Sequence, residues 1–195
     1  MTLENLLQGQ VSDARKAELD NLAKELAKLD TGTAIQFICT HNSRRSHLCE
    51  IWFRTAALFY GLEAKTLSGG TEGTALYPTV AEALKQLGFN ASSEQFKGQL
   101  AWKIAHPEVQ QLEEVALMYS KTYDEAAGSE PMAAIMVCDS ANEGCPFIPN
   151  ALLRAPLLYV DPKWSDGSEQ ELATYVETAK LMAAEMGYLV RAMRP

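Results

Sequence analysis

Two residues that are six positions apart suggest thiol chemistry on a bound anion. Cys39 ends the apolar run FIC, and Arg45 follows after the polar stretch THNSR. A thiolate is a strong nucleophile, and a guanidinium can hold a tetrahedral oxyanion with two parallel hydrogen bonds. The pair therefore predicts a site where a cysteine attacks an oxyanion. The alternative reading, a buried thiol at a strand end followed by surface arginines, stays open on this spacing alone.

The elements predicted around the pair strengthen the first reading. Residues 34–39, AIQFIC, indicate a buried strand, and residues 45–60 have the apolar pattern of a helix that ends at Gly61. A loop that enters a helix N-terminus turns backbone N–H groups inward, and the helix dipole adds positive potential. Such a loop binds an anion and stabilises a thiolate, so we expect Cys39 to be nucleophilic. Ser46 could donate a hydrogen bond to this thiolate, and Asn42 tolerates the left-handed conformation that a tight loop requires.

Strands and helices alternate along most of the chain. Further strands are indicated at 64–67, 133–138 and 157–160, and further helices at 77–87 and 169–186. This alternation predicts an α/β domain with a mostly parallel, twisted sheet that carries helices on both faces. Ligands bind at the carboxyl ends of such strands, where Cys39, Cys138 and Asp161 are all expected to lie.

Two segments extend this pattern. Residues 1–30 read as an N-terminal helical extension to a domain at 31–195, because Leu19, Leu22 and Leu26 recur at helical spacing. Its apolar face either packs on the domain itself or forms a dimer contact. An insertion is predicted around 95–128. There GQLAWKIA and EVALMYSKTY favour an added hairpin over a single helix across QQLEEVALMYSKTYDEAA.

Composition limits the possible partners and the compartment. The chain has 195 residues, 47% of them hydrophobic, and a net charge of −8. Without a basic stripe we expect no nucleic-acid partner, and without a long apolar run no membrane association. The N-terminus MTLENLLQGQ does not resemble a signal peptide, which favours a cytoplasmic protein. In that compartment the four cysteines are expected to be thiols, redox residues or metal ligands rather than a disulfide framework.

The stretch CTHNSRRS resembles the C-x5-R-[ST] anion loop of the low-molecular-weight protein tyrosine phosphatases and of the arsenate reductases that share their fold. YVDPKW resembles the late Asp-Pro of these proteins, whose aspartate is the general acid. The resemblance implies that Cys39 is the nucleophile, Arg45 the anion clamp and Asp161 the acid. It places around the anion the loop residues Thr40, His41, Asn42, Ser43, Arg44 and Ser46. His41 departs from the usual glycine and could strain the loop, whereas Arg44 is expected to be a peripheral charge.

A second motif separates the two branches of this family. VCDSANEGCPFIP resembles the segment of thioredoxin-coupled arsenate reductases that carries two redox cysteines, here Cys138 and Cys145. The resemblance implies a thiol relay that begins at Cys39 and is regenerated by thioredoxin as an external reductant. The alternative is a phosphatase that hydrolyses phosphate monoesters through a phosphocysteine; a third reading is an oxyanion-binding regulator without turnover.

The other candidate sites are weaker. The sequence predicts neither a tightly bound cofactor nor a metal site, because His47 and Cys49 lack the usual ligand spacing. Cys49 is expected to be a small core residue. A homodimer stays open.

Overall fold

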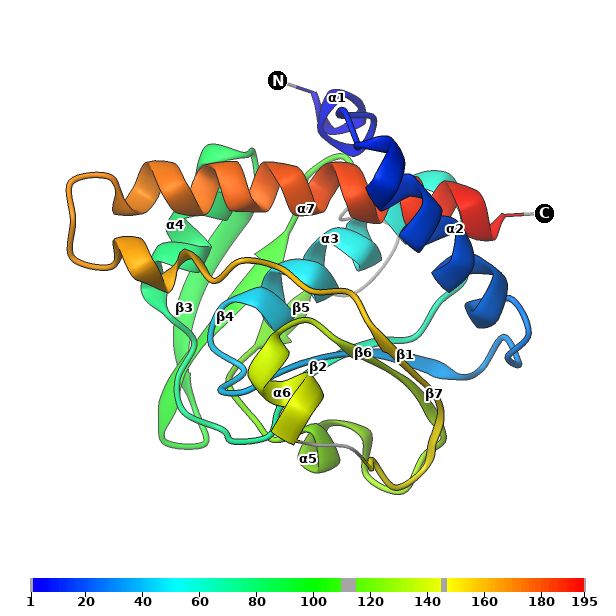
Figure 1. Ribbon diagram of the computed structural model, residues 1–195. Coiled ribbons are helices and arrows are strands. Elements are labelled where there is room, and N and C mark those ends of the chain that lie inside the picture. The colour runs from blue at the N-terminus through cyan, green and yellow to red at the C-terminus, as the bar shows by residue number, and fades with distance from the viewer. Residues whose placement is uncertain (1, 110–114, 145–146, 195) are drawn as a thin grey trace.

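A computed structural model describes residues 2–109, 115–144 and 147–194 of the chain (Figure 1). Its centre is a sheet of four strands in the order β2-β1-β6-β7, and all neighbouring strands are parallel. The bounds of these strands are Ala34–Cys39 for β1, Thr66–Gly70 for β2, Met132–Met136 for β6 and Ala151–Pro156 for β7. The predicted parallel α/β sheet is therefore confirmed.

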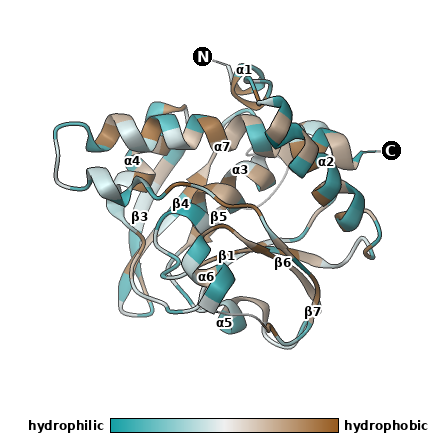
Figure 2. Cartoon of the chain, in the orientation of Figure 1, coloured by the Kyte–Doolittle hydropathy of each residue, from teal (hydrophilic) through white to brown (hydrophobic). Residues whose placement is uncertain are grey.

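Helices cover both faces of this sheet. The helices of the described ranges are α1 (Leu3–Leu7), α2 (Asp13–Leu26), α3 (Arg45–Tyr60), α4 (Pro78–Gln86), α5 (Tyr123–Ala127), α6 (Asp139–Gly144), the 3-10 helix η2 (Pro162–Ser165) and α7 (Glu171–Met193). Of these, α1, α2 and α4 pack mainly against α7. In Figure 1, α3 and α7 lie on one side of the sheet and α5 and α6 on the other. Every residue of β1 is buried, as expected for a strand covered on both faces. Figure 2 shows hydrophobic residues along the central strands and alternating with hydrophilic ones along α7.

Local sequence signals explain where the elements next to the anion loop begin and end. α3 starts at Arg45, directly after the loop, and ends at Gly61, whose φ of 69° is the left-handed conformation that favours glycine. Pro78 occupies the first turn of α4, where its missing N–H costs no hydrogen bond. The prediction of a last strand at 157–160 is wrong. The last strand is β7, which ends at Pro156, and residues 157–160 connect it to Asp161 without regular secondary structure.

The N-terminal extension packs on the domain itself. The leucines of α1 and α2 are buried, and Arg191 of α7 donates a hydrogen bond to the Leu7 carbonyl at 2.8 Å. Gly187 permits this approach, because a Cβ at that position would lie 2.1 Å from the same carbonyl oxygen. The structure thus supports the prediction that the apolar face of the N-terminal extension packs on the domain itself, over the alternative that it forms a dimer contact. Although α7 has 23 residues, none of the helices in the described ranges combines the length and apolar character needed to cross a membrane.

A second sheet holds the segment that the sequence suggests as an insertion. It is antiparallel, in the order β3-β4-β5, with strands at Asn90–Phe96, Gln99–Ala105 and Ala116–Met118. The expected hairpin is present as β4 and β5, but the sheet also contains β3, which was not predicted. A two-residue turn joins β3 to β4, and both of its residues, Lys97 and Gly98, have positive φ as in a type I′ turn. Residues 110–114 lie outside the described ranges.

Candidate active site

The parallel pairing of β1 with β6 brings two thiol-bearing segments to the same edge of the sheet. Ile38 pairs with Met136, so Cys39 and the segment that leads to Cys138 leave the sheet side by side. A cavity of about 160 Å³ opens at this edge. The residues that line it are Cys39, Thr40, His41, Ser43, Arg44, Arg45, Ser140, Asp161 and Lys163. Ser140 and Lys163 were not predicted as site residues. The only indication in the sequence is that each lies within two positions of a predicted site residue, Cys138 or Asp161.

The floor of the cavity rests on two buried polar residues of the anion loop. The Cys39 Sγ atom lies 3.1 Å from Ser46 Oγ, and Asn42 Nδ2 donates to the same oxygen at 2.9 Å. Since the amide occupies a lone pair of Ser46 Oγ, the serine hydroxyl hydrogen can point to the sulfur, where it stabilises a thiolate. Asn42 has the expected left-handed φ, 43°. Both residues were predicted to contact substrate, but they are fully buried beneath the cavity because they bond the loop to itself.

A buried histidine supports the loop from below, and sequence reasoning considered it only as a metal ligand. His47 Nε2 lies 2.9 Å from the Asn42 carbonyl, and Ser68 Oγ lies 3.2 Å from His47 Nδ1. Burial, and then the charge of Lys121, lower the pKa of His47 to about 3. The neutral ring must donate from Nε2, because a carbonyl only accepts, so Nδ1 accepts the Ser68 hydroxyl hydrogen. His47 is therefore a structural part of the loop.

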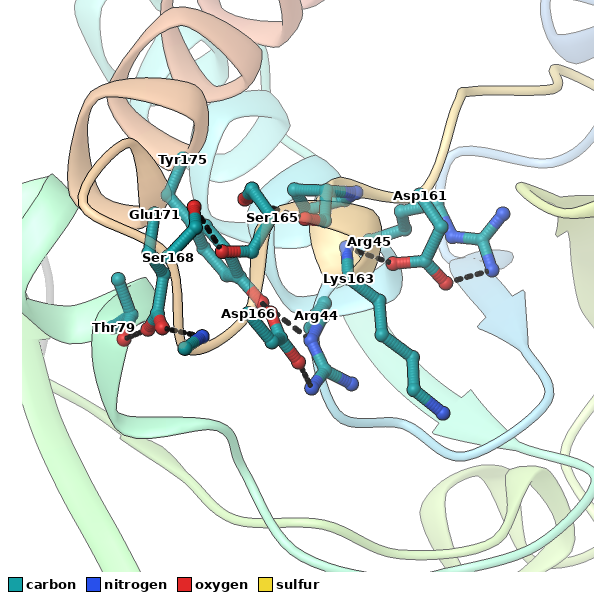
Figure 3. A network of polar contacts seen from close by, with 12 residues as sticks. Arg44, Arg45, Thr79, Asp161, Lys163, Ser165, Asp166, Ser168, Glu171 and Tyr175 are labelled. Carbon is teal, nitrogen blue, oxygen red and sulfur yellow. Dashed lines mark hydrogen bonds and ion pairs between the residues drawn. The ribbon is translucent and has the colours of Figure 1, made fainter.

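Arg45 and Asp161 are in direct contact at the cavity wall. Arg45 Nη2 lies 2.5 Å from Asp161 Oδ2, and Arg45 Nη1 donates to the Tyr159 carbonyl at 3.0 Å. Asp161 Oδ1 accepts the backbone N–H of Lys163 at 3.1 Å, which fixes the carboxylate at the start of η2. Figure 3 shows Arg45 directed to Asp161 while its neighbour Arg44 turns away from it. The predicted anion clamp and the predicted acid thus share one wall.

Arg44 is not the peripheral charge that the sequence suggests. Its side chain is only 11% exposed and pairs with Asp166, while Nε donates to the Tyr175 hydroxyl (Figure 3). Its guanidinium also lies 4.1 Å from the centre of the Tyr77 ring. The Tyr175 hydroxyl in turn donates to Asp166 at 2.6 Å. Arg44 therefore anchors the anion loop to the segment before α7, and its charge is paired with the Asp166 carboxylate.

His41 fits the loop without the strain that its departure from glycine suggested. Among the described residues other than glycine, positive φ occurs at Asn42, Lys97 and Asn150, so His41 is not left-handed. Its Nδ1 atom lies 3.4 Å from Glu72 Oε2, and its side chain is 45% exposed. His41 is one of the residues that line the cavity.

Cys138 lies directly behind the anion loop. It is 1% exposed, and its Sγ atom is 3.5 Å from Thr40 Oγ1 and 3.4 Å from the backbone nitrogen of Ala141. Cys145, its predicted partner, lies outside the described residues. Cys49 is fully buried 3.9 Å from the Met182 sulfur, and burial raises its pKa well above the usual value. The structure thus confirms Cys49 as a core residue.

The described residues show no cluster of three or more His, Cys, Asp or Glu side chains that could hold a metal ion. The groups that the cavity offers for chemistry are a thiol, a guanidinium, a carboxylate and an ammonium, contributed by Cys39, Arg45, Asp161 and Lys163. This set suits nucleophilic attack on a small oxyanion, with a carboxyl group at hand for proton transfer.

Known proteins share this fold and this sequence pattern. The chain is 26% identical over 137 residues to an arsenate reductase of Bacillus subtilis, covering 70% of this chain and 79% of that protein. It is 25% identical over 151 residues to arsenate reductase 2 of Staphylococcus epidermidis, covering 75% of this chain and 95% of that protein. Among solved structures, a low molecular weight phosphotyrosine phosphatase from Vibrio cholerae matches with a TM-score of 0.56 and 18% identity, covering 82% of this chain and 95% of that one.

The family assignment rests on a match to a family model. The model of the low molecular weight phosphotyrosine protein phosphatase family matches residues 34–140, which is more than half of the chain. That range begins with β1 and includes the anion loop and Cys138. The chain belongs to the low molecular weight phosphotyrosine protein phosphatase family.

Proposed function

We propose that this chain is an arsenate reductase that works by a thiol relay through Cys39, Cys138 and Cys145 and is regenerated by thioredoxin. The observation that carries the proposal is the position of Cys138, whose buried thiol lies 3.5 Å from the hydroxyl of Thr40, the residue after Cys39. Hydrolysis of a phosphate ester through a phosphocysteine does not require a second thiol at this position. The curated relatives named arsenate reductase support the same choice.

In the first step the Cys39 thiolate attacks arsenic and forms a sulfur–arsenic bond. An oxygen leaves as water after Asp161 donates a proton to it. The Cys138 thiolate then attacks the Cys39 sulfur; a disulfide forms, the sulfur–arsenic bond breaks, and its electron pair stays on arsenic, which leaves as arsenite. The two electrons that reduce arsenic thus come from the two sulfurs.

The last two steps return the chain to its starting state. Cys145 attacks the Cys138 sulfur and releases the Cys39 thiolate, so that the disulfide moves to Cys138 and Cys145. Thioredoxin then reduces this disulfide by thiol–disulfide exchange and is itself oxidised. The segment between the two cysteines, DSANEG, consists of small and polar residues and forms the short helix α6.

The test measures arsenite formation with thioredoxin, thioredoxin reductase and NADPH. Wild-type protein should produce arsenite, and Cys138→Ser should abolish production. Cys49→Ser is the matched control, because it removes a buried thiol that has no place in the relay, and it should keep the activity. Arsenate reduction by Cys138→Ser at the wild-type rate would refute the relay.

The second candidate is a phosphatase that hydrolyses phosphate monoesters through a phosphocysteine. It is favoured by the family match and by the presence of Cys39, Arg45 and Asp161 in one cavity, since this chemistry needs only these residues and water. If the wild-type protein hydrolyses an aryl phosphate but forms no arsenite, the phosphatase is the correct assignment.

A further inference from the structure

We propose that the second sheet braces the anion loop, and that Gln99 and Ser120 are positioning residues for the reaction at Cys39. The proposal rests on the proposed function only in that the loop must bind an oxyanion. It concerns the segment 119–122, which follows β5 and passes directly beneath the loop.

Ser120 joins this segment to the loop backbone. It is 3% exposed, its hydroxyl donates to the His41 carbonyl at 3.0 Å, and the same oxygen accepts the backbone N–H of Thr74 at 2.9 Å. The Thr74 hydroxyl also donates to the His41 carbonyl, at 3.2 Å. One buried serine therefore joins the loop that contains His41 to the loop that contains Thr74.

Gln99, the first residue of β4, fixes Ser120 in turn. Its Nε2 atom donates to the Ser120 carbonyl at 2.8 Å, and its Oε1 atom accepts the Ser120 N–H at 3.0 Å. A side-chain amide that bonds both backbone groups of one residue restrains that residue much as a neighbouring strand would. The position of Ser120 is therefore set by the second sheet.

The next residue orients the hydrogen bonds that reach the nucleophile. The Lys121 backbone N–H donates to Asn42 Oδ1 at 2.9 Å, so the amide nitrogen of Asn42 must face Ser46. Ser46 Oγ lies 3.1 Å from Cys39 Sγ. A continuous chain of contacts thus links the second sheet to the reactive sulfur, and it sets the direction of each donor along the way.

The main sheet holds the same segment from the other side. The Gly70 N–H donates to the Lys121 carbonyl at 3.0 Å, and Gln36 Nε2 donates to the Tyr123 carbonyl at 2.8 Å. Gly69 has room for this contact only as a glycine, because a Cβ there would lie 2.5 Å from the Tyr123 Cα atom. The segment 119–122 is therefore fixed between the two sheets, as a brace must be.

The test compares Ser120→Ala and Gln99→Met with the control Gln95→Met, which changes an exposed glutamine on β3 of the same sheet. Two readouts are used: the dissociation constant of inorganic phosphate, and the rate of Cys39 alkylation by iodoacetamide as a function of pH in a Cys138→Ser background. For each brace variant we expect phosphate to bind about fivefold more weakly, the equivalent of one lost hydrogen bond. We also expect the midpoint of the alkylation profile to move to higher pH, and Ser120→Thr, which keeps the hydroxyl, to restore both values.

A purely structural role would lower the thermal midpoint of Ser120→Ala while leaving phosphate affinity and the alkylation profile as in wild type, and that result would overturn the proposal. The control should match wild type in both readouts. Failure of wild-type protein to bind phosphate would count against the proposed function, whereas the brace would still be judged by the alkylation profile, which needs no oxyanion.

Discussion

The guanidinium of Arg45 lies 2.5 Å from the carboxylate of Asp161. An oxyanion that enters the cavity therefore meets a cation that is already paired, and it approaches a carboxylate of the same sign. Binding must redistribute the Arg45 hydrogen bonds between the anion and Asp161, whose side chain is 33% exposed. Affinity for the anion and provision of the proton thus depend on the same contact.

Removal of the Asp161 charge should separate these two effects. In Asp161→Asn the guanidinium is released for the anion and the repulsion disappears, so phosphate should bind several-fold more tightly. The turnover number should fall about 100-fold, because an amide cannot supply the proton. Isothermal titration with phosphate and steady-state turnover measure the two quantities. Weaker phosphate binding by Asp161→Asn would contradict the competition for Arg45.

The adjacent arginines should respond differently to the same conservative change. Arg45→Lys loses the bidentate geometry at the anion and should lower kcat/KM about 100-fold with little loss of stability. Arg44→Lys loses the contacts with Tyr175 and Asp166, and the free energy of unfolding should fall by about 1–2 kcal/mol while most of the turnover remains. Each variant is the control of the other, in urea denaturation and in kinetics. Equal losses of activity would contradict their separate roles.

The buried neutral His47 should make stability depend on pH. Its pKa is lowered from 6.5 to about 3 in the folded protein, so between these values the unfolded chain binds a proton that the folded chain does not. The stabilising contribution is complete above pH 6.5 and is lost as the pH falls toward 3, at up to about 1.4 kcal/mol per pH unit. His47→Gln should show a shallower decline than wild type in urea denaturation between these limits. Parallel curves for the two proteins would rule out this linkage.

The main sheet and its reactive edge could be predicted from sequence because local patterns determine them. AIQFIC is apolar apart from Gln36 and is buried throughout, and Arg45 begins α3 where the polar loop ends. The anion loop could be recognised for the same reason, since Cys39, Asn42 and Arg45 lie within one short stretch.

The supports of the loop that come from distant segments could not be predicted. Ser120 reaches the His41 carbonyl, and Lys121 reaches Asn42, only through the topology of the second sheet, whose first strand, NASSEQF, alternates too weakly to be recognised. The role of Arg44 could not be predicted for a related reason. Its partners Asp166 and Tyr175 lie more than 100 positions away in the sequence, and no motif near Arg44 indicates that they contact it.

We expect the electrons that reduce arsenate to come from the thiols of this chain. A single-turnover experiment tests it most directly: fully reduced protein is mixed with arsenate in the absence of thioredoxin, arsenite is quantified, and the disulfide is located by peptide mass mapping. We expect one arsenite per chain and a disulfide between Cys138 and Cys145. No arsenite, with every thiol still reduced, would contradict it.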